Sequence, residues 1–202
     1  MSREDRKAII RNETHALARE LKTQGTILGG LATTMWVLEL VDIFVLRQSL
    51  NIYGIIPRHI IGLRGILFAP FLHGGLGHLI ANTIPFLVLG WFVMLQETSD
   101  FFVVTAITML VSGLGVWVFG APGPHIGASG VIFGYIGFLL ARGYFERNFP
   151  SILLALIVGF FYGGALWGIL PSVPGISWEG HLFGFVGGVL AARFMSRRKK
   201  LA

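Results

Sequence analysis

The sequence contains no cysteine, and it is poor in charged residues. The lack of cysteine excludes disulfide bonds, thiol nucleophiles and cysteine metal sites. Charged residues make up only 13% of the chain, against about 25% in soluble domains, while hydrophobic residues make up 54%. Because the charges cluster between long apolar runs, the composition predicts a polytopic membrane protein. The net charge of +6 is only a weak sign of nucleic-acid binding, since membrane proteins concentrate Lys and Arg in cytoplasmic loops.

Six apolar segments approach the ~20 helical residues that a bilayer crossing needs. They run over Thr26–Leu46, Leu76–Leu95, Phe101–Phe119, Ser129–Ala141, Ile152–Leu170 and His181–Phe194. The fourth and the sixth are short. We therefore predict an all-α fold, a polytopic bundle of six transmembrane helices. No cleavable signal peptide is expected, because the polar residues 1–24 precede an apolar run that is too long for one.

Basic residues predict the orientation of this bundle. Thirteen lie in the two ends and in the connection between the fourth and fifth segments, namely Arg3, Arg6, Lys7, Arg11, Arg19, Lys22, Arg142, Arg147, Arg193, Arg197, Arg198, Lys199 and Lys200. Three lie on the opposite side, namely Arg47, Arg58 and Arg64. We expect both termini in the cytoplasm, with residues 1–25 as a cytoplasmic segment, 26–195 as the membrane domain and 196–202 as a basic tail. The apolar connection between the first two segments is expected at the membrane interface.

Ser129 and His181 are candidate functional residues because polar groups within a membrane are costly. At 1.5 Å per helical residue, Ser129 lies roughly 20 Å above the cytoplasmic boundary marked by Arg142. His181 lies roughly 18 Å above the boundary marked by Arg193. The two depths agree, and both lie about 10 Å below the outer surface of the hydrocarbon core.

His78 and Asn82 are expected in the same layer. Asn82 lies roughly 22 Å from the boundary at Glu97, and His78 lies one turn above it on the same helix face. In the predicted orientation, all three helices present their amino ends to this layer, where free N–H groups and helix dipoles favour negative charge. The arrangement suits an oxyanion intermediate.

A serine hydroxyl is a weak nucleophile and needs a neighbouring base. His181 is the only histidine in the last two segments, and no Asp or Glu near it forms an obvious third member, so we predict a Ser129–His181 dyad. Oxyanion donors are expected from the side chains of His78 and Asn82 and from the Ser129 N–H. Small residues at four-residue spacing let helices approach closely, and they also occur in plain helix packing. Here they are Gly130 and Gly134 with Gly137, and Gly180, Gly184 and Gly188.

Other polar residues have simpler interpretations. His73 is closer to the loop and is expected to be structural, and His125 is expected to be a loop residue. Glu39 and Asp42, near the outer end of the first segment, are expected to be interfacial or bonded to loop backbone.

Three motifs, in order on the second, fourth and sixth segments, resemble the rhomboid family of intramembrane serine proteases. Residues 71–82 read Phe-Leu-His-Gly-Gly-Leu-Gly-His-Leu-Ile-Ala-Asn, similar to the family's His-(x)4-His-x-x-x-Asn signature. Residues 127–130 read Gly-Ala-Ser-Gly, and residues 181–188 match His-x-x-Gly-x-x-x-Gly. Each motif alone is weak, but their order over residues 26–195 is specific.

The resemblance implies that Ser129 is the nucleophile and His181 the base, with His78, Asn82 and the Ser129 N–H in the oxyanion hole. Substrates would be single-span membrane proteins, cut near the outer end of the transmembrane helix without a metal or cofactor. The expected partners are these substrates and the lipid bilayer, with the oligomeric state left open. Without organelle signals, the expected location is a bacterial inner membrane. Supporting positions are Gly127, Gly130, Phe133, Gly184, Gly188, His73 and Arg64, the last matching the arginine of a Trp-Arg pair in the first loop.

Three positions depart from the family pattern. Leu63 stands where the family often has Trp, and Gly180 stands where Ala is usual, which loosens the helix before the histidine. Phe133 stands where Tyr is common, so its ring is expected to stack on His181 without offering a hydroxyl.

Three other functions fit the sequence less well. An inactive rhomboid-like protein that binds membrane helices would be marked by loss of the serine or the histidine, and both are present. A small transporter predicts inverted repeats and broken helices, which the sequence lacks. An α/β-hydrolase requires Gly-x-Ser-x-Gly after a strand, but Val131 occupies the last position and no strand pattern precedes it.

Overall fold

The computed structural model describes residues 3–171 and 175–201, and this part of the chain is helical without strands. The long helices are α1 (Arg3–Phe44), α3 (Leu76–Met94), α4 (Thr98–Phe119), α5 (Ser129–Glu146), α6 (Phe149–Tyr162) and α7 (Trp178–Leu201). Short elements are η1 (Ser49–Tyr53), η2 (Ile60–Arg64), α2 (Gly65–Phe68), η3 (Ala69–Phe71) and η4 (Gly163–Ile169). The prediction of an all-α polytopic membrane fold is confirmed.

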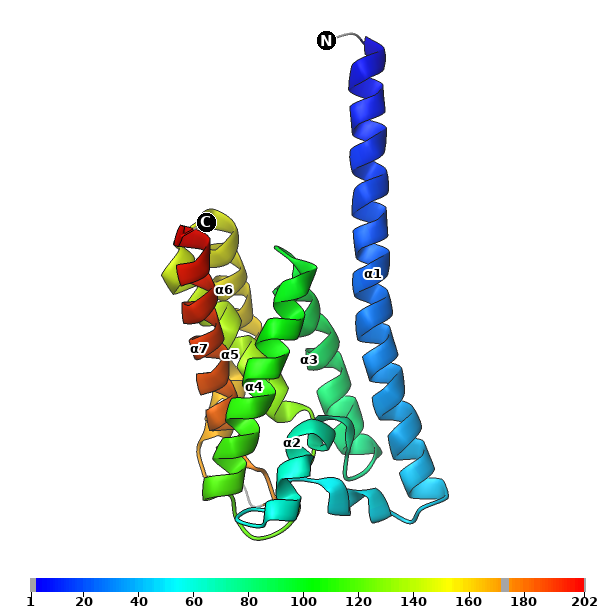
Figure 1. Cartoon of the computed structure of the whole chain (residues 1–202), viewed down its shortest axis with the longest axis vertical. Coiled ribbons are helices and arrows are strands. Elements are labelled where there is room, and N and C mark those ends of the chain that lie inside the picture. Colours follow the sequence, from blue (N-terminus) through cyan, green and yellow to red (C-terminus); the bar gives the residue numbers. More distant parts are fainter. Residues whose placement is uncertain (1–2, 172–174, 202) are drawn as a thin grey trace.

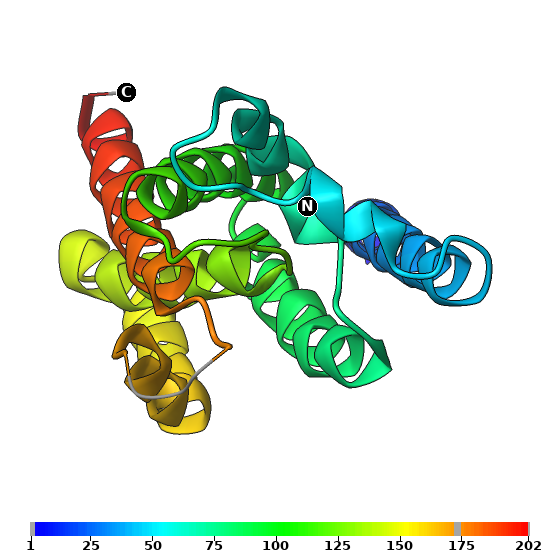
Figure 2. The same ribbon diagram turned by 90° about the horizontal axis from the view of Figure 1, so that it is seen from below.

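Helix α5 lies at the centre of the bundle. It packs against α3, α4, α6 and α7, and eleven of its eighteen residues are buried (Figure 2). The core side chains around it include Tyr135, Phe138 and Leu139 from α5 itself, with Phe101 and Leu89 from its neighbours. Helices α3, α5 and α7 all begin at the same end of the molecule, the lower end in Figure 1.

Among the residues that the structure describes, four helices are long and apolar enough to cross a membrane, over Glu4–Phe44, Leu76–Met94, Thr98–Phe119 and Phe149–Ile169. The count of six therefore stays a prediction for α5 and α7. The apolar character of α5 and α7 is lowered by their glycines, by the buried Arg142 of α5 and by the polar first turn of α7.

The helices of the fourth and sixth segments extend beyond the apolar residues from which they were predicted. Helix α5 continues beyond Ala141 to Glu146, and α7 spans 24 residues. Arg142 was assigned to a connecting loop, but it lies within α5 with only 2% of its surface exposed. Its guanidinium forms an ion pair with Asp100 of α4 at 3.1 Å and another with Glu146 at 2.9 Å. A buried arginine with two acidic partners continues the helix instead of ending it.

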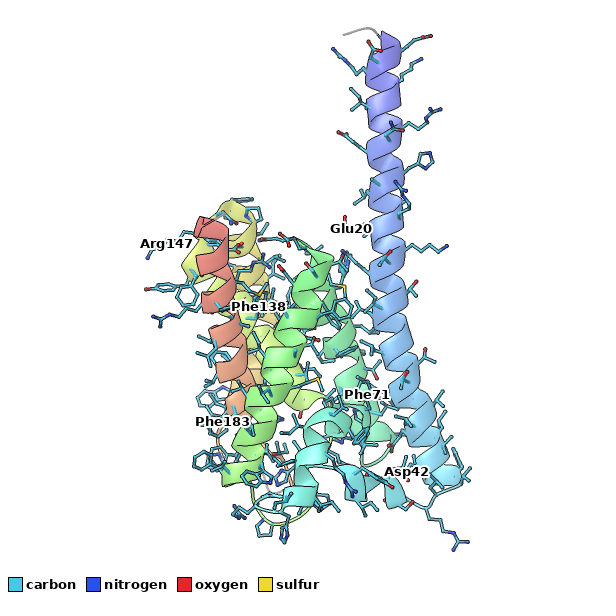
Figure 3. The ribbon with its side chains drawn as sticks, viewed as in Figure 1. Glu20, Asp42, Phe71, Phe138, Arg147 and Phe183 are labelled. Atoms are coloured by element: carbon cyan, nitrogen blue, oxygen red, sulfur yellow. The ribbon has the colours of Figure 1, made fainter. Side chains whose placement is uncertain are left out.

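Helix α1 is a single helix of 42 residues, about 63 Å long. Its first part stands clear of the bundle, and Figure 3 places Glu20 near the level where the bundle ends. Gln24 is the first residue of α1 described as buried, and its amide donates to the Met94 carbonyl at 3.3 Å. The boundary predicted between residues 25 and 26 falls inside this helix without a break.

The first loop, between α1 and α3, folds into short helical turns at the end of the bundle where the three motif helices begin (Figure 1). Three glycines allow its backbone to pack tightly, because a Cβ at Gly54, Gly62 or Gly65 would collide with backbone atoms. Large apolar side chains remain on its surface, with Ile60 at 84% exposure and Leu67 at 60%. These exposed residues suit a loop that lies against lipid.

Candidate active site

A cleft of about 1020 Å³ opens at the amino ends of α3, α5 and α7. The four residues predicted to meet in one layer, Ser129, His181, His78 and Asn82, all line it. Phe133 and Gly74 also face it, and its apolar wall is formed by Pro85, Ile132, Ile136, Tyr162 and Ala165.

Ser129 is the first residue of α5, and the backbone before it makes a tight turn. Gly127 has φ +113°, a backbone conformation that residues other than glycine rarely adopt. Its N–H donates to the Ala69 carbonyl at 2.9 Å. A Cβ on Gly127 would also lie 2.6 to 2.7 Å from atoms of the His78 ring. The glycine therefore lets the chain turn into α5 and lets His78 approach the residues just before the serine.

His181 lies in the first turn of α7, with 8% of its surface exposed. Its Nδ1 lies 2.9 Å from the carbonyl oxygen of Gly168 in η4. A carbonyl oxygen only accepts, so Nδ1 carries the proton and Nε2 has a free lone pair in the neutral ring. The Phe133 ring stacks on the imidazole with centroids 4.0 Å apart and planes at 5°, so the expected stacking is present.

His78 and Asn82 are joined through the first turns of α3. The Gly74 N–H donates to His78 Nδ1 at 3.3 Å, so the His78 proton resides on Nε2, which can donate into the cleft. The Asn82 amide donates one hydrogen to the His78 carbonyl at 2.8 Å, and its nitrogen carries a second. Asn82 is 5% exposed, so its amide is held within the wall of the cleft.

Ser129 and His181 face the same cleft without a hydrogen bond between them among the described residues. Their role as a dyad remains a proposal.

A model of the Rhomboid domain matches residues 62–198 of the chain, which is more than half of it. The chain belongs to the rhomboid family. It is 42% identical over 187 residues to an uncharacterized protein of Mycobacterium tuberculosis, covering 88% of this chain and 78% of that protein. It is also 33% identical over 128 residues to the rhomboid protease GluP of Bacillus subtilis, covering 60% of this chain and 24% of that protein. RHOMBOID-like protein 4 of Arabidopsis thaliana is 30% identical over 135 residues, covering 62% of this chain and 32% of that protein.

Within this rhomboid domain, the glycines of α5 and α7 lie between the two helix backbones. An added Cβ on Gly184 would collide with the Gly130 carbonyl, and one on Gly188 would collide with the Gly134 carbonyl. Gly130 itself lies closest to Ser112 of α4. Close approach of the serine and histidine helices therefore depends on the α7 glycines and on Gly137 of α5, whose added Cβ would collide with the Phe185 carbonyl, while Gly130 makes room for α4.

Two supporting positions of the rhomboid pattern do not reach the cleft. His73 is buried at 1% exposure, with its ring edge-on to His78 at 5.1 Å between centroids. Arg64 donates to the Ile52 carbonyl at 3.0 Å and lies 4.4 Å over the Tyr53 ring. It holds the first loop together and does not contact the candidate catalytic residues.

Sequence reasoning missed three contacts that hold the rhomboid site. Besides the Gly168 carbonyl, Ser112 Oγ donates to the Gly180 carbonyl at 2.9 Å, and His125 Nδ1 lies 2.7 Å from Ser177 Oγ. A peptide carbonyl carries no signal in a sequence, and a lone serine in an apolar helix is common. The pairing of His125 and Ser177 depends on two loops that only the fold brings together.

Proposed function

We propose that this chain is a serine endopeptidase that cuts single-span membrane proteins near the outer end of their transmembrane helix. The observation that carries the proposal is the shared cleft, in which Ser129 and His181 face His78 and Asn82 at the amino ends of three helices. Membership of the rhomboid family and the similarity to a rhomboid protease support it.

In the first step, Ser129 Oγ attacks the substrate carbonyl carbon and passes its proton to His181 Nε2. The Gly168 carbonyl supports this assignment, because it keeps the other ring proton on Nδ1. The imidazolium then gives its proton to the leaving amine nitrogen as the peptide C–N bond breaks. Water hydrolyses the acyl-enzyme through the same base and frees Ser129.

The negative charge of the tetrahedral intermediate would be held by hydrogen-bond donors in the cleft. His78 Nε2–H, the second Asn82 amide hydrogen and the Ser129 N–H are the candidate donors. Because α3, α5 and α7 begin there, their positive dipole ends act in the same sense. The proposed reaction uses no metal or cofactor.

Substrates are proposed to be transmembrane helices that unwind locally. An intact helix bonds its peptide carbonyls internally and shields them from a nucleophile, so the cut segment must leave the helix. The apolar wall formed by Ile132, Ile136 and Pro85 fits the side chains of such a segment.

The protein is proposed to lie in a bacterial plasma membrane with both termini in the cytoplasm. The mycobacterial and Bacillus relatives support the bacterial assignment. The excess of Lys and Arg at the two ends supports the orientation.

Cleavage of a single-span substrate by the purified chain in liposomes tests the proposal. Ser129→Ala and His181→Ala should each reduce cleavage below detection, since loss of the nucleophile or base of a serine protease can cost about 10⁶-fold in kcat. Asn82→Ala should lower kcat by ~10²-fold if it supplies one oxyanion donor. Ser99→Ala and His15→Ala, on exposed surface outside the cleft, serve as matched controls and should cleave like the parent. Parent-like cleavage by Ser129→Ala would refute the proposal.

The alternative is an inactive rhomboid that binds membrane helices, in which Ser129 and His181 line the cleft without reacting. A fluorophosphonate probe separates the two functions, because only an activated serine is phosphonylated. We expect labelling that disappears in Ser129→Ala, whereas an unlabelled, folded parent would support the binding function.

A further inference from the structure

Glu39 is a buried acid in a helix that otherwise shows much of its surface to its surroundings. It lies on α1 with 2% of its surface exposed, although only 28% of the apolar window of that helix is buried. A buried acid within a membrane span is costly, so Glu39 is expected to have a specific hydrogen-bond partner.

The partner is the peptide that begins α3. Glu39 Oε1 accepts from the Gly75 N–H at 2.6 Å, a short distance typical of hydrogen bonds to a charged acceptor. Gly75 is the N-cap residue of α3 with φ +117°, so an acid here also lies at the positive end of that helix. The second oxygen, Oε2, is buried without a hydrogen-bond partner among the described residues.

The preceding peptide holds the candidate oxyanion donor. The Gly74 N–H donates to His78 Nδ1 at 3.3 Å, and this bond leaves the proton on Nε2 of an imidazole ring that lines the cleft. Two successive N–H groups of one glycine turn are thus held by different side chains, one by His78 and the next by Glu39. Gly74 and Gly75 have no side chains that could fix the conformation of this turn, and the glycine backbone is conformationally free.

We infer that Glu39 is a positioning residue for His78. By holding the Gly75 N–H it fixes the Gly74–Gly75 turn, and that turn keeps His78 in the tautomer and orientation that donate to an oxyanion. The inference rests on the proposed protease function. It gives α1, which contributes no residue to the lining of the cleft, a defined part in the reaction.

Asp42 offers a matched control one turn along α1. It is equally buried, at 3% exposure, and its Oδ1 accepts from the Leu50 N–H at 3.0 Å (Figure 3 labels Asp42). Both acids therefore fasten α1 to backbone, but only Glu39 reaches α3. If anchoring of α1 in general mattered, substitution of either Glu39 or Asp42 would lower kcat.

The test compares Glu39→Met, which keeps the length but removes the acceptor, with Glu39→Gln, which keeps an acceptor oxygen. Glu39→Met should lower kcat by ~10-fold with KM within about 2-fold of the parent, since misplacing a group by 1 Å can cost ~10²-fold and an oxyanion donor acts in the transition state. Glu39→Gln should recover at least half of the parent kcat, and Asp42→Asn should leave kcat within about 2-fold of the parent.

A double-mutant cycle with His78→Ala shows whether the effect passes through His78. In the His78→Ala background, Glu39→Met should cause no further fall in kcat. An equal fall in both backgrounds, or a parent-like kcat for Glu39→Met, would overturn the inference. If Glu39→Met does not yield folded protein, Glu39→Ala takes its place in the same cycle with the same outcomes. Ser129→Ala is measured alongside, because its loss of cleavage upholds the protease function even where the Glu39 variants behave like the parent.

Discussion

His181 is oriented by a peptide carbonyl rather than by a carboxylate. In Ser-His-Asp triads an acid receives the Nδ1 proton, holds the tautomer and stabilises the imidazolium. Here the Gly168 carbonyl holds the tautomer at 2.9 Å, and the Phe133 ring covers one face of the imidazole. A neutral carbonyl stabilises an imidazolium less than a full charge would, so orientation becomes the larger part of its contribution.

Gly168→Ala should lower cleavage while leaving the fold intact. A Cβ at this position would lie 3.1 Å from Phe133 Cζ and 3.2 Å from His181 Nδ1, so both rings must shift by a few tenths of an ångström. We expect kcat to fall by ~10-fold, within the range for a misplaced catalytic group. The measurement is kcat for a single-span substrate in liposomes.

Gly164→Ala is the control for this change. It lies in the same η4 segment, and its added Cβ would meet no atom within 4 Å. Equal rates for the two alanine variants would show that the Gly168 contact does not orient the base.

At the scale of the elements, α5 and α7 are held together by backbone contact. The Cβ that Gly188 lacks would overlap the Gly134 carbonyl, and a backbone atom cannot rotate away as a side-chain tip can. The two helices are therefore joined at a separation that only glycine permits.

Gly188→Ala should destabilise the bundle by about 1–3 kcal/mol, as overpacking of a tight contact does. Thermal unfolding in detergent, followed by helical circular dichroism, measures it. Gly29→Ala on α1, where an added Cβ meets no atom within 4 Å, should be neutral or stabilising. An unfolding midpoint for Gly188→Ala equal to that of Gly29→Ala would contradict the packing role.

Element positions were largely predictable, and the exceptions have physical causes. The second segment was expected at Leu76–Leu95, and α3 spans Leu76–Met94. The two ranges agree because the apolar run begins directly after a loop glycine and ends before a polar turn. Arg142 misled the prediction of the fourth segment, since a sequence shows its charge but not its ion pair with Asp100. The four cleft residues were predicted from depth and helix period, whereas the Gly168 carbonyl and Ser112 act through contacts that exist only in the folded chain.

For the whole molecule, the lack of cysteine makes the predicted orientation directly measurable. Any engineered cysteine is the only thiol in the chain. Labelling by a membrane-impermeant maleimide therefore shows on which side of the membrane that cysteine lies, without labelling of other residues of the chain. His15→Cys, exposed on α1, should react only from the cytoplasmic side, and His59→Cys, exposed in the first loop, only from the outside. The reverse pattern in intact cells and inverted vesicles would refute the assignment of both termini to the cytoplasm.

The unbroken helix α1 has a mechanical consequence. If it pivots as a rod about its outer end at Phe44, Arg3 lies about 62 Å from the pivot and Glu39 about 8 Å. A sideways excursion of 8 Å at the amino end then moves Glu39 by about 1 Å. The lever ratio reduces motion of the projecting end about eightfold at the carboxylate that accepts from the Gly75 N–H, so only an excursion larger than about 8 Å at that end would displace this carboxylate by more than about 1 Å.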